Sequence, residues 1–338
     1  MEYKVIIGID QSKLTVDAAL LMVTNPEQLV TEQFENNVKG FKNMVKWLKK
    51  QSVCSLEELL ICTENTGLYS YPLSVFCQEN GLALWIENPL QIKQSLGIQR
   101  GKNDRTDAKR IAQYAFTHRH QVKLYSMPAK SLLTLKQLLA YRERLVESKK
   151  SFQIAKGELT EFKADLSGLV VRETNSVLKT IDKQIKKVHE SMLQLVQSDE
   201  TLNKQYQLII TVPGVGDITA LYLLIYTGAF SRFNDWKQFA CYCGIVPFDH
   251  QSGTSIRAKT RVSSLANKKL KSLLTMCALG MIKTDKEFKQ YYQRRKAEGK
   301  NSMSVINVLR NKLVSRVFAV VRRETAYIPF EQYHQVAA

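Results

Sequence analysis

The order of apolar runs in the first ninety residues is the feature that most restricts the possible folds. Short runs rich in β-branched residues predict strands, whereas apolar residues that recur every three or four positions predict helices. The predicted strands are residues 3–10, 16–23, 29–34, 59–63 and 82–86. A helix is predicted after each of the last three, so three strands come first and strands then alternate with helices. This order predicts an α/β domain built on one sheet.

Three leading strands followed by alternation are typical of a ribonuclease-H-like sheet. In such a sheet the first and fourth strands are neighbours, and here each is closed by an acidic residue, Asp10 or Glu64. A charge at the end of an apolar strand is unfavourable unless a cleft exposes it, so both residues are candidates for function. Asp17 is a rival candidate, but it lies in mid-strand and is expected to face solvent.

Two further carboxylates, Asp104 and Asp107, lie three residues apart at the start of a helical pattern. Helix capping and pairing with the helix dipole would explain them without any function. Together with Asp10 and Glu64, however, they form a set of hard oxygen ligands that suits Mg²⁺ or Mn²⁺ rather than zinc. Cations held by such a set support phosphoryl transfer. We interpret the four residues as the metal-binding, catalytic set of a nuclease-type site.

The net charge of +18 comes from 49 Lys and Arg against 31 Asp and Glu. The excess is concentrated, because residues 256–323 contain 18 basic and 3 acidic residues. Such a field favours a polyanion partner, most simply nucleic acid, although a merely basic soluble protein would have the same total charge. The helix expected around residues 305–316 would turn Arg310, Lys312 and Arg316 to solvent or to a ligand. The candidate nucleic-acid contacts are Lys102, Arg105, Arg257, Lys259, Arg261, Lys268 and Lys269.

Beyond residue 131 apolar residues recur every seven positions. One series runs from Leu138 to Leu166 and a second from Leu178 to Leu195, with a break at Gly168. The repeats predict two long antiparallel helices or a coiled coil. These helices would form an oligomerisation arm or pack on their own domain, and the pattern leaves both open. Three domains are expected, with boundaries at residues 1–125, 126–200 and 201–338.

The last region opens with apolar helices around the turn Pro213-Gly214-Val215-Gly216, which predicts a helix-hairpin-helix element. Glycine allows backbone N–H groups to approach a phosphate, so Gly214 and Gly216 are candidate nucleic-acid contacts, although a plain connecting turn would look the same. Ser252 lies in a polar turn before the basic run. Beside cations it could attack a phosphodiester, but serine before glycine is usually only turn chemistry. The rest of this region is expected to be mostly helical.

The six cysteines show neither C-x-x-C pairing nor histidines at zinc spacing, so we expect reduced core residues of a cytoplasmic protein. No signal peptide is evident before the first strand, and no apolar run approaches the length of a membrane span. No membrane partner is therefore expected.

Five motifs in one order resemble those of the DEDD transposase family, which includes Piv-type DNA invertases and insertion-sequence recombinases that use a bridge RNA. The motifs are residues 8–13 (Gly-Ile-Asp-Gln-Ser-Lys), 63–67 (Thr-Glu-Asn-Thr-Gly), 102–108 (Lys-Asn-Asp-Arg-Thr-Asp-Ala), 213–216 and 244–253. The resemblance spans nearly the whole chain. One departure is Ala266, which stands where a glycine often follows the serine in this family.

The resemblance implies a RuvC-like N-terminal domain, a coiled coil for dimerisation and a C-terminal transposase domain whose catalytic serine is Ser252, with Ser255 as the runner-up. It further implies a tetrameric synaptic complex, donor and target DNA, a structured bridge RNA and a prokaryotic, nucleoid-associated protein. The site would join carboxylates and serine from different protomers. Such a protein would cleave and rejoin DNA strands as a transposase or site-specific recombinase.

Four other classes of protein share part of this pattern. A Piv-like invertase would act without a guide RNA, and a RuvC-like hydrolytic nuclease of the junction-resolvase type would use water in place of Ser252. A non-enzymatic nucleic-acid binder would use only the hairpin element and the basic region. An actin-like sugar kinase also opens with Gly8-Ile9-Asp10, but its further phosphate-binding glycine loops are not evident.

Overall fold

The computed structural model describes residues 3–51, 55–95, 97, 103–161, 167–252 and 256–329. The chain forms two compact units, Met1–Met127 and Pro128–Ala338. Unit 1 contains a five-stranded sheet with the strand order β3-β2-β1-β4-β5. The strands are β1 (Val5–Gln11), β2 (Thr15–Met22), β3 (Asn25–Glu35), β4 (Leu59–Glu64) and β5 (Ala83–Glu87).

The pairing of the strands defines the fold class of unit 1. β2 pairs antiparallel with both β1 and β3, while β4 pairs parallel with both β1 and β5. This mixed sheet is the ribonuclease-H-like topology, so the predicted fold class is confirmed. The third strand is longer than expected, because β3 is an edge strand whose side chains are mostly exposed and polar. An apolar pattern therefore marks only part of it.

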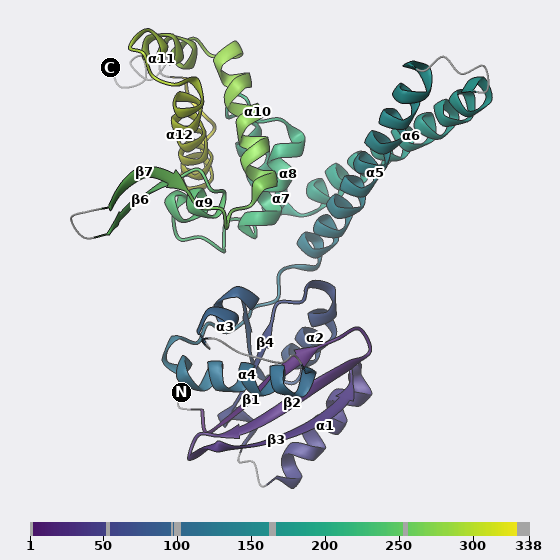
Figure 1. Cartoon of the computed structure of the whole chain (residues 1–338), viewed down its shortest axis with the longest axis vertical. Coiled ribbons are helices and arrows are strands. Elements are labelled where there is room, and N and C mark those ends of the chain that lie inside the picture. Colours follow the sequence, from purple (N-terminus) through teal and green to yellow (C-terminus); the bar gives the residue numbers. More distant parts are fainter. Residues whose placement is uncertain are drawn as a thin grey trace. The chain divides into compact units, whose positions relative to one another are not determined.

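Helices cover both faces of this sheet. α1 (Val38–Lys50) and α2 (Tyr71–Glu79) pack on one face, where Phe41 and Phe76 join the buried side chains of β1, β2 and β4. α4 (Asp104–Thr117) packs on the other face through Ala108, Ile111 and Ala112, together with Ile92 of α3 (Pro89–Ser95). Both faces of the central strands are therefore buried. The helices that cover them are labelled in Figure 1.

Unit 2 is mostly helical. α5 (Lys130–Glu161) and α6 (Ser167–Ser198) run side by side as a long helical hairpin (Figure 1), as the heptad pattern predicts. Near residues 130–139 and 188–196 the hairpin contributes Leu135, Met192 and Val196 to the core of unit 2. Farther out, Phe152, Ile154 and other apolar side chains are exposed. One end of the hairpin thus packs on its own unit, and the other end presents apolar surface.

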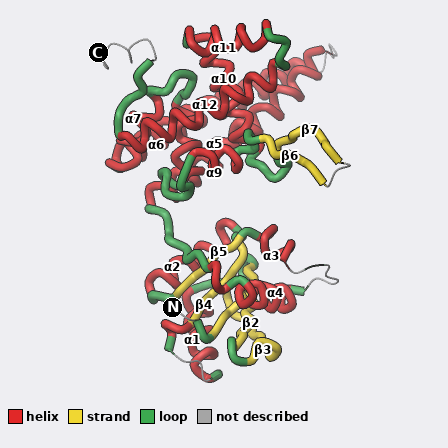
Figure 2. The backbone as a smooth tube through the Cα atoms, turned by 90° about the vertical axis from the view of Figure 1, so that its left-hand side faces the viewer, coloured by secondary structure: helices red, strands yellow, loops and turns green. Residues whose placement is uncertain are grey.

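The remaining helices of unit 2 surround one core and carry a two-stranded sheet. β6 (Pro247–Ser252) and β7 (Ile256–Val262) pair antiparallel and are drawn in yellow in Figure 2. Ser252 therefore closes a strand, where the sequence predicts a turn. The helices are α7 (Glu200–Ile210), α8 (Asp217–Thr227), α9 (Trp236–Tyr242), α10 (Lys268–Thr284), α11 (Lys286–Ala297) and α12 (Ser302–Arg323).

Glycine allows a close approach where β6 and β7 join this core. Gly244 has a φ of 65°, and a Cβ built on it would lie 2.2 Å from the Cβ of Ala266. The next residue, Asn267, caps α10 by accepting a hydrogen bond from the Leu270 N–H at 3.0 Å. The alanine that departs from the family pattern is therefore packed directly against a glycine.

Cysteine behaves as expected in the described residues. Cys62, Cys77, Cys243 and Cys277 are buried free thiols, and Cys241 is half-buried. Cys54 lies outside the described residues. Within the described ranges no helix has the length and apolar character of a membrane span.

Candidate active site

The ends of two neighbouring parallel strands position Asp10 and Glu64. Ile9 and Thr63 are Cα partners in the β1–β4 register, so Asp10 and Glu64 follow at the same level. Ile6 and Leu60, each four residues before the acid on its own strand, belong to the core under α4. Because side chains alternate between faces along a strand, Asp10 and Glu64 both point to the α4 side. Residues 54 positions apart in the sequence therefore meet on one face.

A glycine allows α4 to pack close against this face. A Cβ built on Gly8 would lie 2.2 Å from the Ala112 nitrogen and 2.3 Å from the Ala108 carbonyl oxygen. Only a residue without a side chain permits the backbone of a helix to pack so closely on a strand. Gly8 is two residues before Asp10, and Ala108 directly follows Asp107. This contact thereby anchors the N-terminal turn of α4 beside the end of β1.

The cap of α4 is Asn103, not an aspartate. Its side-chain oxygen accepts the Arg105 N–H at 3.1 Å, and its carbonyl oxygen accepts the Asp107 N–H at 2.9 Å. Asp104 and Asp107 therefore do not serve as the N-cap, although both lie in the first turn, where they pair with the helix dipole. Asp107 forms an ion pair with Arg110 at 2.6 Å.

The pKa of Asp10 shows that the four carboxylates lie close enough to interact. The pKa of Asp10 is raised from 3.8 to about 6, first by burial and then by the charges of Glu64, Asp104 and Asp107 in that order. A hydrogen bond from the Gln11 backbone opposes the increase in the pKa only weakly. The structure thus brings all four predicted residues into one electrostatic group. Like charges held together in this way favour a cation.

The donor set fits a hard divalent cation. Every group is a carboxylate, and Asp10 is half-buried, so its charge is poorly compensated by water. Within the described ranges no three His, Cys, Asp or Glu side chains are close enough to form a cage around one ion. Mg²⁺ does not need such a cage, because it keeps several waters and is usually held by one or two carboxylates and by substrate phosphates. Asp10, Glu64, Asp104 and Asp107 are the residues that would hold it.

Asp17 is buried, and the expectation that it faces solvent is wrong. It is 4% exposed, and Gln33 of β3 donates a hydrogen bond to its Oδ2 at 3.0 Å. In the β1–β2 register Asp17 lies directly opposite Asp10. Opposed residues on antiparallel strands point to the same face. The error has a physical cause: a mid-strand acid faces solvent only if one face of the sheet is open, and here helices cover both.

Glu87 is a further carboxylate on this face that the sequence analysis did not identify. It closes β5 and is the Cα partner of Glu64 in the β4–β5 register. The Tyr114 hydroxyl of α4 donates a hydrogen bond to its Oε2 at 3.2 Å. Burial and then the charge of Glu87 raise the pKa of Tyr114 to about 12. The rule that singles out Glu64, an acid closing an apolar strand, would also have found Glu87.

The candidate nucleophile belongs to unit 2. Ser252 is the last residue of β6 and the Cα partner of Ile256. The side chains of residues 250–259, which include Ser252, Arg257 and Lys259, lie outside the described set, as do Gly253 to Ser255 and Lys102. The assignment of Ser252 or Ser255 as nucleophile therefore stays a prediction.

The other predicted nucleic-acid contacts differ in their surroundings. Arg105, Arg261 and Lys268 are exposed. Lys269 is paired with Glu143 of α5 at 3.6 Å, and the Tyr222 hydroxyl donates a hydrogen bond to the same carboxylate. Arg105, Arg261 and Lys268 are therefore accessible to a polyanion, whereas Lys269 already has a partner within the protein.

The two glycines of the predicted hairpin element also differ. A Cβ built on Gly214, whose φ is 81°, would lie 2.5 Å from the Cys277 carbonyl oxygen of α10. Close helix packing therefore accounts for Gly214 without a ligand. Gly216 is exposed and precedes the first turn of α8, and a Cβ built on it would meet open space. A role in binding phosphate stays a prediction for both.

The α12 cations are less exposed than expected. Arg310 is buried at 4% exposure. Arg316 pairs with Glu287 at 3.2 Å, and Lys312 lies 4.3 Å from the centre of the Tyr291 ring. Positive charge in a helix sequence thus does not by itself identify a free surface.

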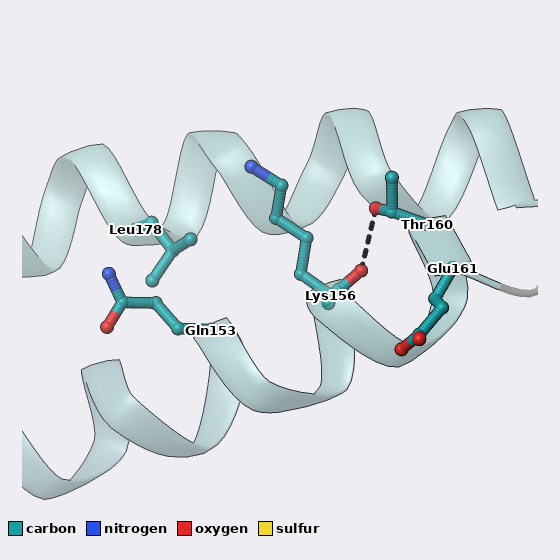
Figure 3. Close-up of a pocket in the computed structure, with 6 residues that line it drawn as sticks. Gln153, Lys156, Thr160, Glu161 and Leu178 are labelled. Atoms are coloured by element: carbon teal, nitrogen blue, oxygen red, sulfur yellow. Dashed lines mark hydrogen bonds between the residues drawn. The ribbon is translucent and has the colours of Figure 1, made fainter.

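A groove of about 520 Å³ lies near one end of the helical hairpin, between α5 and α6. Figure 3 shows Gln153, Lys156, Thr160, Glu161 and Leu178 around it, with the Thr160 hydroxyl donating to the Lys156 carbonyl oxygen at 2.8 Å. Its wall combines one cation, one carboxylate, an amide, a hydroxyl and one apolar side chain. This composition gives it no chemistry related to the acidic face.

The sheet order and the acidic face place unit 1 in the ribonuclease-H-like class. Residues 206–293 match the family model described as the transposase IS116/IS110/IS902 family, and residues 7–155 match a DEDD transposase model of the same group. The pilin gene-inverting protein of Moraxella bovis is 30% identical over 329 residues, which cover 96% of this chain and 98% of that protein. The chain belongs to the IS110 family of transposases and related recombinases.

Two further similarities have lower identity. The transposase for insertion sequence element IS1111A of Coxiella burnetii is 26% identical over 277 residues, covering 73% of each chain. A solved structure of Thermus thermophilus RuvC in complex with a Holliday junction substrate matches with 15% identity and a TM-score of 0.28, covering 36% of this chain and all of that one. By its family, the protein is an enzyme of the recombinase and transposase class.

Proposed function

We propose that the protein cleaves and rejoins DNA strands with two chemical groups, the carboxylates of unit 1 and the hydroxyl of Ser252. The convergence of Asp10, Glu64, Asp104 and Asp107 on one sheet face carries this proposal, because four like charges held together favour a bound cation. Family membership supports the type of reaction, since relatives are described as transposases and as a gene-inverting protein. Mg²⁺ or Mn²⁺ is the proposed cofactor.

The reaction is a phosphodiester exchange. The Ser252 oxygen attacks the phosphorus of the scissile phosphate and loses its proton. The bond from phosphorus to one sugar oxygen breaks, and that oxygen takes up a proton to become a hydroxyl. The DNA strand is then esterified to the serine. Attack by the hydroxyl of another strand reverses the step, forms the new DNA linkage and releases the serine.

The carboxylates hold the divalent cations in this scheme. When bound, divalent cations neutralise the negative charge that develops on the phosphoryl oxygens. Asp10 and Glu64 on the rigid sheet, with Asp104 and Asp107 on the docked helix, would fix where those cations are held.

A trapped covalent adduct tests this function. Wild-type protein and Ser252→Ala are incubated with end-labelled substrate DNA and Mg²⁺, and denatured complexes are separated by gel electrophoresis. We expect a protein–DNA adduct and recombinant product with the wild type, neither with Ser252→Ala, and unchanged DNA binding in both. An adduct retained in Ser252→Ala and lost in Ser255→Ala would assign the nucleophile to Ser255.

Hydrolysis is the main alternative chemistry. Protein-free products ending in hydroxyl and phosphate groups, formed equally well by Ser252→Ala, would show that water attacks and that the protein is a RuvC-like nuclease. Loss of all activity in Asp10→Ala separates both enzymes from a non-enzymatic binder.

The choice between a guided transposase and a Piv-like invertase depends on RNA. The concentrated positive charge of residues 256–323 supports a structured bridge RNA that pairs with donor and target DNA. The similarity to gene-inverting proteins over nearly their full length favours inversion as the second candidate. Purification followed by extraction of nucleic acid distinguishes them. A co-purified RNA of defined length, whose removal by ribonuclease abolishes recombination, supports guidance, whereas full activity of an RNA-free preparation supports the invertase.

We further propose that copies of the chain associate through the outer part of the α5–α6 hairpin. Phe152 and Ile154 of α5 and Leu169 and Val170 of α6 are between 41% and 63% exposed. Apolar side chains gathered in this way are typical of protein interfaces. A Phe152→Glu, Val170→Glu double variant should lower the mass measured by sedimentation equilibrium from dimer or tetramer to monomer, whereas the exposed Glu173→Gln should not.

A further inference from the structure

The middle of α12 contains a buried arginine. Arg310 is 4% exposed and lies among the buried residues Leu309, Leu313 and Val314. An arginine is rarely buried to this extent without a partner for its charge, because removal of a guanidinium from water is strongly unfavourable. Burial lowers the pKa of Arg310 below its ordinary value. A specific arrangement must therefore hold the charge in place.

Asn307 positions Arg310, and Asn311 binds the same backbone oxygen as Asn307 does. Its Nη1 donates to the Oδ1 of Asn307 at 3.2 Å. The Nδ2 of Asn307 donates in turn to the Ile245 carbonyl oxygen at 2.8 Å, and the Nδ2 of Asn311 donates to the same oxygen at 3.0 Å. The amide of Asn307 is thus used at both ends. It ties the guanidinium to the segment that leads from α9 into β6.

No carboxylate compensates Arg310 within the described residues. Its Nε is buried and has no hydrogen-bond partner there. Nearby acids in the sequence are engaged elsewhere: Asp235 and Asp285 cap helices, while Glu287, Glu298 and Glu324 pair with Arg316, Arg295 and Lys204. An oriented but uncompensated cation is unusual for a purely structural residue, since breaking or omitting a buried pair is more unfavourable than replacing it with apolar groups.

We propose that Arg310 is a binding residue for a phosphodiester oxygen of nucleic acid, taken up where β6 begins. A guanidinium binds phosphate through two parallel N–H donors, and Asn307 occupies only one Nη1 hydrogen bond. The buried position makes the contact strong, because a charge-assisted hydrogen bond gains strength where water is excluded. This inference depends on the proposed function only in taking nucleic acid as the ligand.

The surrounding charge and position favour nucleic acid over a protein carboxylate. Residues 256–323 have an excess of 15 positive charges, from 18 basic and 3 acidic residues, which repels cations and attracts a polyanion. The segment from Ile245 to Pro247 continues directly into β6, the strand that Ser252 closes. A phosphate held at the start of this strand would set the register of the nucleic acid relative to the hairpin.

The test combines binding and stability of the full-length protein. Arg310→Met keeps an unbranched apolar stem but removes the guanidinium and its charge. The matched control is Arg316→Met, because Arg316 lies on the same helix but already has Glu287 as a partner. Equilibrium binding of a duplex DNA and, separately, of a folded RNA hairpin is measured without divalent cations across a salt series, and the melting temperature of each variant is recorded.

We expect Arg310→Met to bind at least one of the two nucleic acids about tenfold more weakly. The slope of log K against log salt should fall by about 0.7–0.9, the value for one lost phosphate contact. Its melting temperature without nucleic acid should stay the same or rise, while that of Arg316→Met should fall. The nucleic acid whose binding weakens, DNA or RNA, is the source of the phosphate.

Two outcomes would overturn the proposal. Unchanged affinity and salt slope for both nucleic acids would show that no phosphate is bound, and a self-association defect in the same variant would assign the charge to a carboxylate of a second copy. Unfolding of Arg310→Met, or a fall in melting temperature as large as that of Arg316→Met, would show that Arg310 has a structural partner. Because the assay needs neither cations nor strand cleavage, its failure leaves the proposed reaction unaffected.

Discussion

Asp10 and Asp17 are direct partners across the antiparallel pair β1–β2, and both point to the sheet face that α4 covers. Like charges directly opposite each other on antiparallel strands are destabilising. Gln33 gives Asp17 one hydrogen bond, but a neutral amide cannot cancel its charge. The fold therefore tolerates a second acid immediately beside the proposed catalytic set.

This pairing predicts that Asp17→Asn stabilises the cation-free protein. The substitution removes one of two opposed charges and keeps a side chain that Gln33 can bind, so we expect a gain of about 0.2–1 kcal/mol in the free energy of unfolding of unit 1. Urea unfolding in the presence of EDTA measures it. Gln33→Ala should have the opposite effect, since it leaves Asp17 buried without its hydrogen bond. A loss of stability in Asp17→Asn would contradict the prediction.

Asp10→Asn should separate stability from cation binding. Without divalent cations we expect this variant to melt at a higher temperature than the wild type, because one buried, repelled charge is removed. Mg²⁺ should raise the melting temperature of the wild type in proportion to the logarithm of its concentration above Kd. It should raise that of Asp10→Asn much less. Thermal melts over a Mg²⁺ series provide the measurement, with Glu173→Gln on α6 as a control that should follow the wild type.

Gly8→Ala should displace α4 and so disrupt the site from a distance. A methyl group at this position would overlap the backbone of Ala108 and Ala112, and overpacking of this kind costs about 1–3 kcal/mol or more. Hydrogen exchange should show faster exchange of the α4 amides, and cleavage of DNA should be lost. Gly157→Ala is the matched control. Gly157 lies in α5 with open space around its Cα, so alanine should stabilise that helix by about 0.5–1 kcal/mol.

The junction of α5 and α7 should show a pH dependence. Asp199 caps α7 and accepts a hydrogen bond from the Ser131 hydroxyl at 2.5 Å, and this bond is the main reason that its pKa is lowered from 3.8. A carboxyl with a lowered pKa stabilises the folded state above its unfolded pKa and loses this contribution as the pH falls through the folded value. Ser131→Ala should therefore shift acid unfolding of unit 2 to higher pH.

Far-ultraviolet circular dichroism during acid titration measures this shift. Ser151→Ala, a change of an exposed serine on the same helix, should leave the midpoint unchanged. Equal midpoints for Ser131→Ala and the wild type would show that the hydrogen bond does not contribute to stability.

The fold of unit 1 could be predicted because its strands are marked by β-branched residues and buried on both faces. The edge strand β3 was recognised only in part, since it is polar and half of it faces water. In the same way, Ser252 was expected in a turn because a polar, basic hairpin such as β6–β7 has no apolar alternation. Apolar patterns in the sequence predict buried elements well and exposed elements poorly.

The candidate site divides along similar lines. Asp10, Glu64, Asp104 and Asp107 could be found because each is an acid at the end or start of an element, and the structure groups them electrostatically. Asp17 and Arg310 were misplaced because periodicity does not show which faces are covered once helices pack on both sides of a sheet or around a helix. Neighbouring strands and helices, far apart in the sequence, determine the burial of these two charges.

The close contact between Gly8 and α4 also has a consequence during synthesis of the protein. The sheet is complete once β5 ends at Glu87, but Asp104 and Asp107 reach the acidic face only after α4 has left the ribosome and docked. In a nascent chain only Asp10 and Glu64, two of the four acids, are therefore in place until α4 has docked. If the acidic set is catalytic, as proposed, an enzyme made in this order acts on DNA only after its first unit is finished.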